Sequence, residues 1–149
     1  TWAELESAGY AQYEVSNFAR PGHVCQHNVN TWRMHSWVGL GPSGASQHRG
    51  VRGANIADLE KWLAGVGRGE RATEDRTMLT PELLVEDSLI FGLRMNEGVD
   101  LAALLGRLPA MAAREVYALV TRLVDEGFAE SSAGRLCLTL RGRLIADAI

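Results

Sequence analysis

The sequence has few cysteines, no long apolar run and no excess of basic residues, and each absence excludes a class of protein. The two cysteines, Cys25 and Cys137, are too few for a disulfide framework and lack the Cys-x2-Cys spacing of a zinc site. No stretch of about 18 apolar residues is present, so no transmembrane helix is expected, while peripheral membrane contact stays open. The net charge of −3 argues against nucleic acid as a partner, because nucleic-acid-binding surfaces are basic. We therefore expect a globular cytoplasmic protein.

The first part of the chain shows the alternation of helices and strands that is typical of an α/β protein. Residues 2–9 predict a helix that ends at Gly9, and residues 10–18 predict a strand. A second buried strand is expected over residues 37–41, followed by a helix that Asn55 caps. Helix, glycine and strand in succession form one step of an α/β barrel or a doubly wound sheet.

The character of the sequence changes at Thr80. Residues 80–95 begin with a cap, a proline and a carboxylate, which together predict a helix start. Asp100 is expected to cap a short helix, and a longer helix is expected over residues 110–126. A hairpin between residues 128 and 140 and a closing helix capped by Thr139 complete the pattern. Three helices, a hairpin and a last helix resemble a winged-helix module.

These elements predict an α+β fold with two parts. Residues 1–66 are expected to supply the last strands and helices of a partial (β/α) barrel. Residues 67–79, rich in glycine at their start, are expected to form a connector. Residues 80–149 are expected to form the winged-helix-like C-terminal domain.

Three short patterns in the first part carry a family resemblance. They are Tyr13-Glu14-Val15-Ser16-Asn17-Phe18, His27-Asn28-Val29-Asn30-Thr31-Trp32 and Gly39-Leu40-Gly41-Pro42-Ser43-Gly44-Ala45-Ser46. Their order and spacing resemble the C-terminal part of the oxygen-independent coproporphyrinogen III oxidase family, including its haem-chaperone branch. The resemblance implies a radical-SAM parent protein with S-adenosylmethionine and a 4Fe–4S cluster on a Cys-x3-Cys-x2-Cys motif. That motif is absent here, so the chain is expected to be a piece that needs the missing N-terminal half of the barrel and is inactive alone.

The second pattern offers a candidate haem or substrate site. An imidazole beside an indole can ligate haem iron while the ring covers the macrocycle. The alternative is a loop histidine bonded to backbone, with the indole in a core. By resemblance to the His-Asn-x-x-Tyr-Trp pattern of the chaperone branch, His27, Asn28 and Trp32 are the expected binding residues. Thr31 stands where that branch has tyrosine, which removes an aromatic hydroxyl.

The third pattern is a glycine-rich loop after a predicted strand. Such a loop lets backbone N–H groups approach a ligand, although a tight strand exit has the same composition. By resemblance, the loop faces the S-adenosylmethionine and substrate cavity. The expected contact residues are Gly39, Gly41, Pro42, Ser43 and Ala45.

The first pattern places Tyr13 and Glu14 on opposite sides of a strand, so one of them faces the barrel interior. A buried Glu14 requires a partner. It is either an acceptor in the cavity or an anchor for a neighbouring loop.

Two functions follow as hypotheses. In the first, the parent protein acts on a tetrapyrrole. The oxidase branch abstracts hydrogen from a propionate chain, which then loses carbon dioxide, whereas the chaperone branch holds haem and is not an oxidase. The His27 pattern favours the chaperone branch. In the second, the chain is a non-catalytic winged-helix binding or regulatory module. In either case, uncovered strands predict self-association of the isolated chain.

Overall fold

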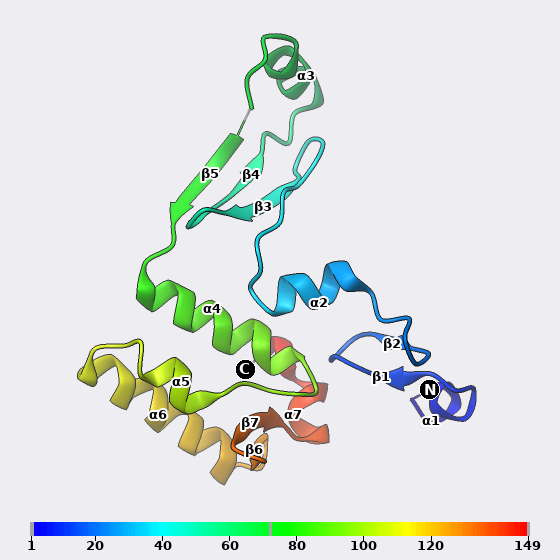
Figure 1. Cartoon of the computed structure of the whole chain (residues 1–149), viewed down its shortest axis with the longest axis vertical. Helices are drawn as coiled ribbons and strands as arrows, with labels where there is room; N and C mark the ends of the chain where they lie inside the picture. The colour runs from blue at the N-terminus through cyan, green and yellow to red at the C-terminus, as the bar shows by residue number, and fades with distance from the viewer. Residues whose placement is uncertain (1, 72, 149) are drawn as a thin grey trace. The chain divides into compact units, whose positions relative to one another are not determined.

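The computed structural model describes residues 2–71 and 73–148 and contains both helices and antiparallel sheets (Figure 1). The helices are α1 (Trp2–Ser7), α2 (Gln26–Trp32), α3 (Leu59–Gly67), α4 (Pro81–Arg94), α5 (Leu101–Leu105), α6 (Ala110–Asp125), α7 (Leu140–Leu144) and the 3-10 helix η1 (Ala146–Ala148). The strands are β1 (Ala11–Gln12), β2 (Phe18–Ala19), β3 (Ala45–His48), β4 (Val51–Asn55), β5 (Thr73–Met78), β6 (Ala129–Ser132) and β7 (Arg135–Leu138). Across the described residues, none of these helices is long and apolar enough to span a membrane.

Contacts between residues group the chain into two compact units. The first unit combines residues 1–34 with residues 81–149, and the second unit is His35–Thr80. The second unit is therefore inserted into the first in sequence. The sequence predicts a different division, with residues 67–79 as a connector between two domains. In the structure, residues 73–78 of that connector form strand β5. This strand carries mostly polar, exposed residues, so it lacks the apolar alternation from which a strand is predicted.

The core of the first unit lies among α4, α5, α6 and the β6–β7 hairpin. Its buried residues are Val85, Leu89, Leu93, Val99, Leu104, Val120, Ala129, Leu136 and Leu138. The predicted order of three helices, hairpin and closing helix is confirmed. The predicted caps are also present, since Asp100 accepts from the Ala103 N–H at 2.9 Å and Thr139 accepts from the Gly142 N–H at 3.1 Å.

The N-terminal hairpin packs against the end of α4. The continuous strand predicted over residues 10–18 is wrong, because β1 and β2 are separate two-residue strands that pair with each other, and Glu14 between them forms an isolated bridge with Met95. Glu14 bends the chain between them, since its Oε1 accepts from the Ser16 N–H at 2.9 Å. Backbone bonds then tie the bend to α4, with the Val15 N–H donating to the Arg94 carbonyl at 2.9 Å.

All strand pairs of the described residues are antiparallel. The described residues therefore form none of the parallel strands of the (β/α) barrel that is expected over residues 1–66. Short polar side chains favour turns over long strands, and the sequence between β1 and β2 contains two of them, Ser16 and Asn17.

The second unit is a three-stranded sheet, in the order β3-β4-β5, with helix α3. The strand predicted over residues 37–41 is wrong, because only Trp37 pairs, with Gln47, and the rest is loop. Asn55 does not cap α3. It is buried at the end of β4, where its amide donates to the Gly41 carbonyl at 2.8 Å, and Asp58 caps the helix instead.

Candidate functional site

Helix α2 carries all three residues of the expected haem site. His27 is exposed in its first turn, and its imidazole makes no hydrogen bond or ion pair with any residue that the structure describes. Asn28 is half-buried, and Trp32 is half-buried at the last position of the helix. An exposed, unpartnered imidazole can coordinate a metal centre that approaches from solution.

The structure does not place these three side chains on one face. His27 and Trp32 are five positions apart, which in an α-helix separates their directions by about 140°. Asn28 and Trp32 are four positions apart and share a face. Thr31, the residue that departs from the family pattern, shares the face of His27 and donates its hydroxyl to the His27 carbonyl at 3.0 Å.

Trp32 is fixed by the C-terminal half of α4. Its ring lies 5.7 Å from the ring of Phe91 at an interplanar angle of 41°. The Arg94 guanidinium lies 4.8 Å from the centre of the indole, within the range of a cation–π contact. The indole is therefore held in place from two sides, although its buried N–H has no partner within the described residues.

Arg94 connects this aromatic pair to the N-terminal bend. Its guanidinium donates to Asp147 at 2.8 Å and to the Ser16 hydroxyl at 3.1 Å. Its Nε lies 3.7 Å from Oε2 of Glu14, which is an ion pair longer than a hydrogen bond. Glu14 is fully buried, and its other oxygen accepts from Ser16 and Asn17. These are the contacts of a loop anchor, the second of the two roles considered for Glu14.

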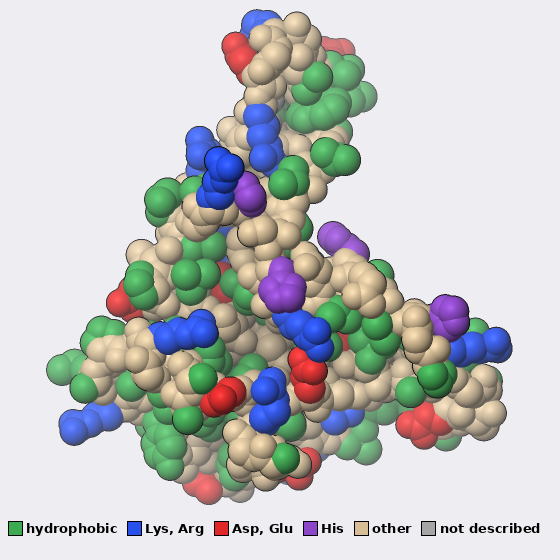
Figure 2. Space-filling model, viewed as in Figure 1, with side chains coloured by type: hydrophobic (Ala, Val, Ile, Leu, Met, Phe, Trp, Pro, Cys, Tyr) green, Lys and Arg blue, Asp and Glu red, His purple; other side chains and the backbone are tan. Residues whose placement is uncertain are grey.

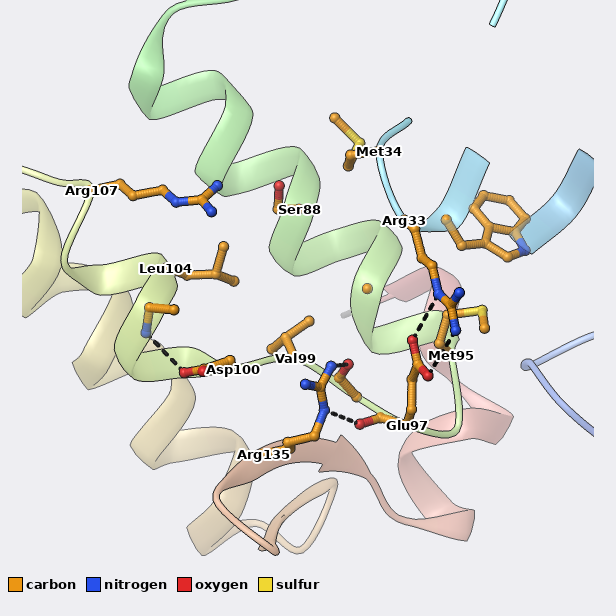
Figure 3. A pocket seen from close by; sticks show the side chains of 14 residues that line it. Arg33, Met34, Ser88, Met95, Glu97, Val99, Asp100, Leu104, Arg107 and Arg135 are labelled. Carbon is orange, nitrogen blue, oxygen red and sulfur yellow. Dashed lines mark hydrogen bonds and ion pairs between the residues drawn. The ribbon is translucent and has the colours of Figure 1, made fainter. Parts of the chain in front are cut away.

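A cavity of about 340 Å³ lies between the end of α2, helix α4 and the β7 strand (Figure 3). Arg33 and Glu97 form a two-bonded ion pair at its edge, with both N···O distances at 3.0 Å. Arg135 donates to the carbonyl oxygens of Glu97 and Gly98 at 2.6 and 2.7 Å. Met95 lies behind the ion pair in this view. The walls are mixed, with apolar groups and several cations.

A second cavity of about 360 Å³ shares Arg33, Met95 and Glu97 with the first. Tyr13 lines it, so this candidate residue does face a hollow, although His27 and Asn28 line neither cavity. No local sequence pattern predicts the Arg33–Glu97 pair, because its members are 64 positions apart and meet only in the folded chain.

The glycine-rich loop lies in the second unit and is packed against itself. A Cβ on Gly39 would collide with the Ala45 carbonyl, and a Cβ on Gly44 would lie 2.8 Å from the Leu40 carbonyl. Gly41 has a φ of +81° and Ser43 a φ of +58°. The close approach of the loop to its own backbone accounts for Gly39 and Gly44. Pro42, Ser43 and Ala45 remain exposed.

The residues present do not fit a 4Fe–4S cluster. Such a cluster needs a set of cysteine thiolates. Cys25 is exposed and Cys137 is buried elsewhere in the fold. No group of three or more potential metal ligands occurs among residues 2–71 and 73–148.

Comparison with known proteins identifies the class. The HemN C-terminal domain family matches residues 79–145. The heme chaperone HemW of Mycobacterium tuberculosis is 33% identical over 148 residues, which cover 99% of this chain and 36% of HemW. The zebrafish (Danio rerio) mitochondrial radical S-adenosyl methionine domain-containing protein 1 is 42% identical over 103 residues, covering 64% of this chain and 23% of that protein.

The fold is also that of a solved structure. The coproporphyrinogen III oxidase HemN of Escherichia coli, a radical SAM enzyme, superimposes with a TM-score of 0.72 at 20% identity, over 97% of this chain and 37% of that one. The chain thus carries a HemN-type C-terminal domain. It belongs to the HemN/HemW family, and it spans about a third of the length of the HemW relatives it matches.

Proposed function

We propose that this chain is the C-terminal part of a haem chaperone and that it contributes to holding haem as cargo. The observation that carries the proposal is the exposed, unpartnered imidazole of His27 on α2. The similarity to HemW over 99% of the chain supports it, because it includes the segment that contains His27. In this role His27 supplies a neutral nitrogen to the haem iron.

The contacts around Trp32 support a positioning role for that residue. The stack on Phe91 and the Arg94 guanidinium hold the indole rigid at the C-terminal end of α2. Trp32 thereby fixes the helix that presents His27, while it faces another direction. Asn28 lies on the Trp32 side, so we assign it to the support of α2 and not to the iron.

S-adenosylmethionine and the cluster belong, in this proposal, to the remainder of the longer protein. The described residues hold no group of three or more potential metal ligands. We also infer that the glycine-rich loop, with Gly39 and Gly41, borders a cavity that other parts of a barrel complete. The module of α4 to α7 with its hairpin is in this proposal a winged-helix-like domain that packs on protein.

Haem titration tests the proposal. Haem added to the purified chain is expected to give a shifted Soret band that saturates, and His27→Ala is expected to abolish the shift. His23→Ala is the matched control, because His23 is an exposed histidine in the loop before α2. Retention of the shift in His27→Ala, or its loss in His23→Ala alone, contradicts the assignment.

The departure at Thr31 gives a second arm. Thr31 is one turn from His27 on the same face, so a tyrosine there lies next to the proposed ligand. Thr31→Tyr is expected to tighten haem binding. An unchanged affinity removes this residue from the site while leaving His27 as the ligand.

A further inference from the structure

The sheet of the second unit has a concave face that gathers positive charge. In Figure 2 blue and purple side chains collect over the β3–β5 sheet in the upper part of the view. A cavity of about 290 Å³ opens on the sheet. It is lined by Ser46, His48, Arg49, Val51, Gly53, Arg71, Thr73 and Arg76. Three of these lining residues are arginines and one is a histidine, and within the described residues no carboxylate lines the cavity.

Two of the arginines are not neutralised. The side chains of Arg49 and Arg76 make no ion pair with the residues that the structure describes, and both are exposed. The acidic residues nearby either bind other groups or do not line the cavity. The Glu74 carboxylate accepts from the Ala57 N–H at 3.2 Å, and Asp75 is not among the lining residues. An anion entering the cavity therefore meets guanidinium groups that have no competing partner.

The third arginine is positioned by the cavity floor. Arg71 donates from Nη2 to the Ser46 hydroxyl at 2.5 Å, and Ser46 is itself buried and bonded to the Gly39 N–H at 2.9 Å. One end of the guanidinium is thus fixed, which leaves its other N–H donors for a ligand. The stem of Arg76 passes over Gly53, where the absence of a side chain keeps the floor low.

The hairpin turn adds an independent observation. Arg49 and Gly50 join β3 to β4 with φ values of +52° and +75°. Two-residue turns with both φ values positive favour Asn-Gly or Asp-Gly, because larger side chains are strained there. Arginine at the first position makes the turn less stable than asparagine would, and it places a positive charge at the rim of the cavity.

From this face we propose that the second unit holds a binding site for an anionic group, a phosphate or a pair of carboxylates, clamped by Arg49, Arg71 and Arg76. The site is separate from His27 and does not depend on haem binding. Guanidinium groups bind both kinds of anion through paired N–H···O bonds, so the chemistry is shared and the source is a question for experiment.

Calorimetric titration of the whole chain at low ionic strength tests the site. Sodium pyrophosphate is the phosphate probe, and succinate is the carboxylate probe. Saturable binding of at least one probe is expected. The probe that binds more tightly shows whether the site prefers phosphate or carboxylate groups. The double variant Arg71→Gln/Arg76→Gln is expected to weaken binding by at least ~10-fold, because charge-assisted bonds are lost.

The matched control is Lys61→Gln/Arg68→Gln. It also removes two positive charges, from exposed positions of the same unit that lie outside the cavity. Arg68 is paired with Glu70. Binding is expected to be unchanged. Failure of both probes to bind the unaltered chain, or an equal loss in the control and the cavity variant, overturns the proposal.

The turn provides a test that misfolding cannot imitate. Arg49→Asn places a residue favoured in the left-handed region at the turn, so the melting temperature is expected to rise while anion affinity falls. A variant that is more stable and binds equally well removes Arg49 from the site. Loss of stability overturns the argument from the turn.

Discussion

Glu14 is a charged side chain that the fold removes entirely from water. One oxygen accepts from Ser16 and Asn17, and the other faces Arg94 at 3.7 Å. Such a group is costly to bury but costlier to remove, because its partners are then left unsatisfied. The same arginine touches the Trp32 ring, so the carboxylate acts on α2 through Arg94.

Replacing Glu14 is therefore expected to destabilise the first unit. Glu14→Ala leaves the Arg94 charge without its buried partner and frees the bend, which corresponds to roughly 3 kcal/mol of unfolding free energy. Urea unfolding followed by tryptophan fluorescence measures the loss. Glu6→Ala, at an exposed position of α1, is the control and is expected to change stability little. Equal losses in both variants would contradict the anchoring role.

At the scale of elements, the β6–β7 hairpin and α7 approach each other through a glycine. A Cβ on Gly142 would collide with the Phe128 carbonyl and lie 3.3 Å from Cβ of Leu138. The Gly142 N–H also donates to the Thr139 hydroxyl, which caps α7, so the start of this helix is fixed at this point. The contact leaves no room for relaxation, because one partner is backbone.

Gly142→Ala is expected to reduce the unfolding free energy by about 3 kcal/mol, since either α7 or the hairpin must move. Gly106→Ala serves as the comparison. Gly106 ends α5 with a φ of −63°, and the nearest atom to its Cβ lies at 3.4 Å. Thermal unfolding of the two variants separates steric exclusion from the general effect of replacing glycine. A Gly142 variant as stable as the Gly106 variant disproves the close contact.

Elements with strong end signals were predictable and those without them were not. Pro81, Asp100 and Thr139 begin helices where the sequence places them, because caps and proline act locally. Strand β3 was missed, since its buried residues are Ser46 and Gln47 and strand patterns are recognised by apolar alternation. The cavity beside Arg33 was equally hidden, because Glu97 and Arg135 reach it from distant parts of the chain.

At the scale of the whole molecule, the sheet of the second unit has an open edge among the described residues. Strand β5 pairs only with β4 in the described part of the chain, and Met78 at its end is 69% exposed. Unpaired edges seek partners. We therefore expect concentration-dependent self-association of the isolated chain, to be measured by light scattering.

The variant Met78→Lys is expected to reduce this association, because a charge on an edge strand opposes pairing. Met111→Lys is the matched control, since Met111 is 76% exposed and lies on helix α6 and not on a strand. A monodisperse monomer at every concentration of the unaltered chain would refute the expectation. If both lysine variants reduce self-association equally, the effect comes from the added positive charge in general and not from the edge of strand β5.

The bond between Ser16 and Arg94 joins residues 78 positions apart, with the whole second unit between them in sequence. A ribosome delivers the N-terminal bend first and α4 only later. At about 5–20 residues per second, the bend waits roughly 4–16 s for its support. Throughout that interval Glu14 and Trp32 lack their contacts with Arg94, so the surroundings of α2 are completed only after the inserted sheet has been synthesised.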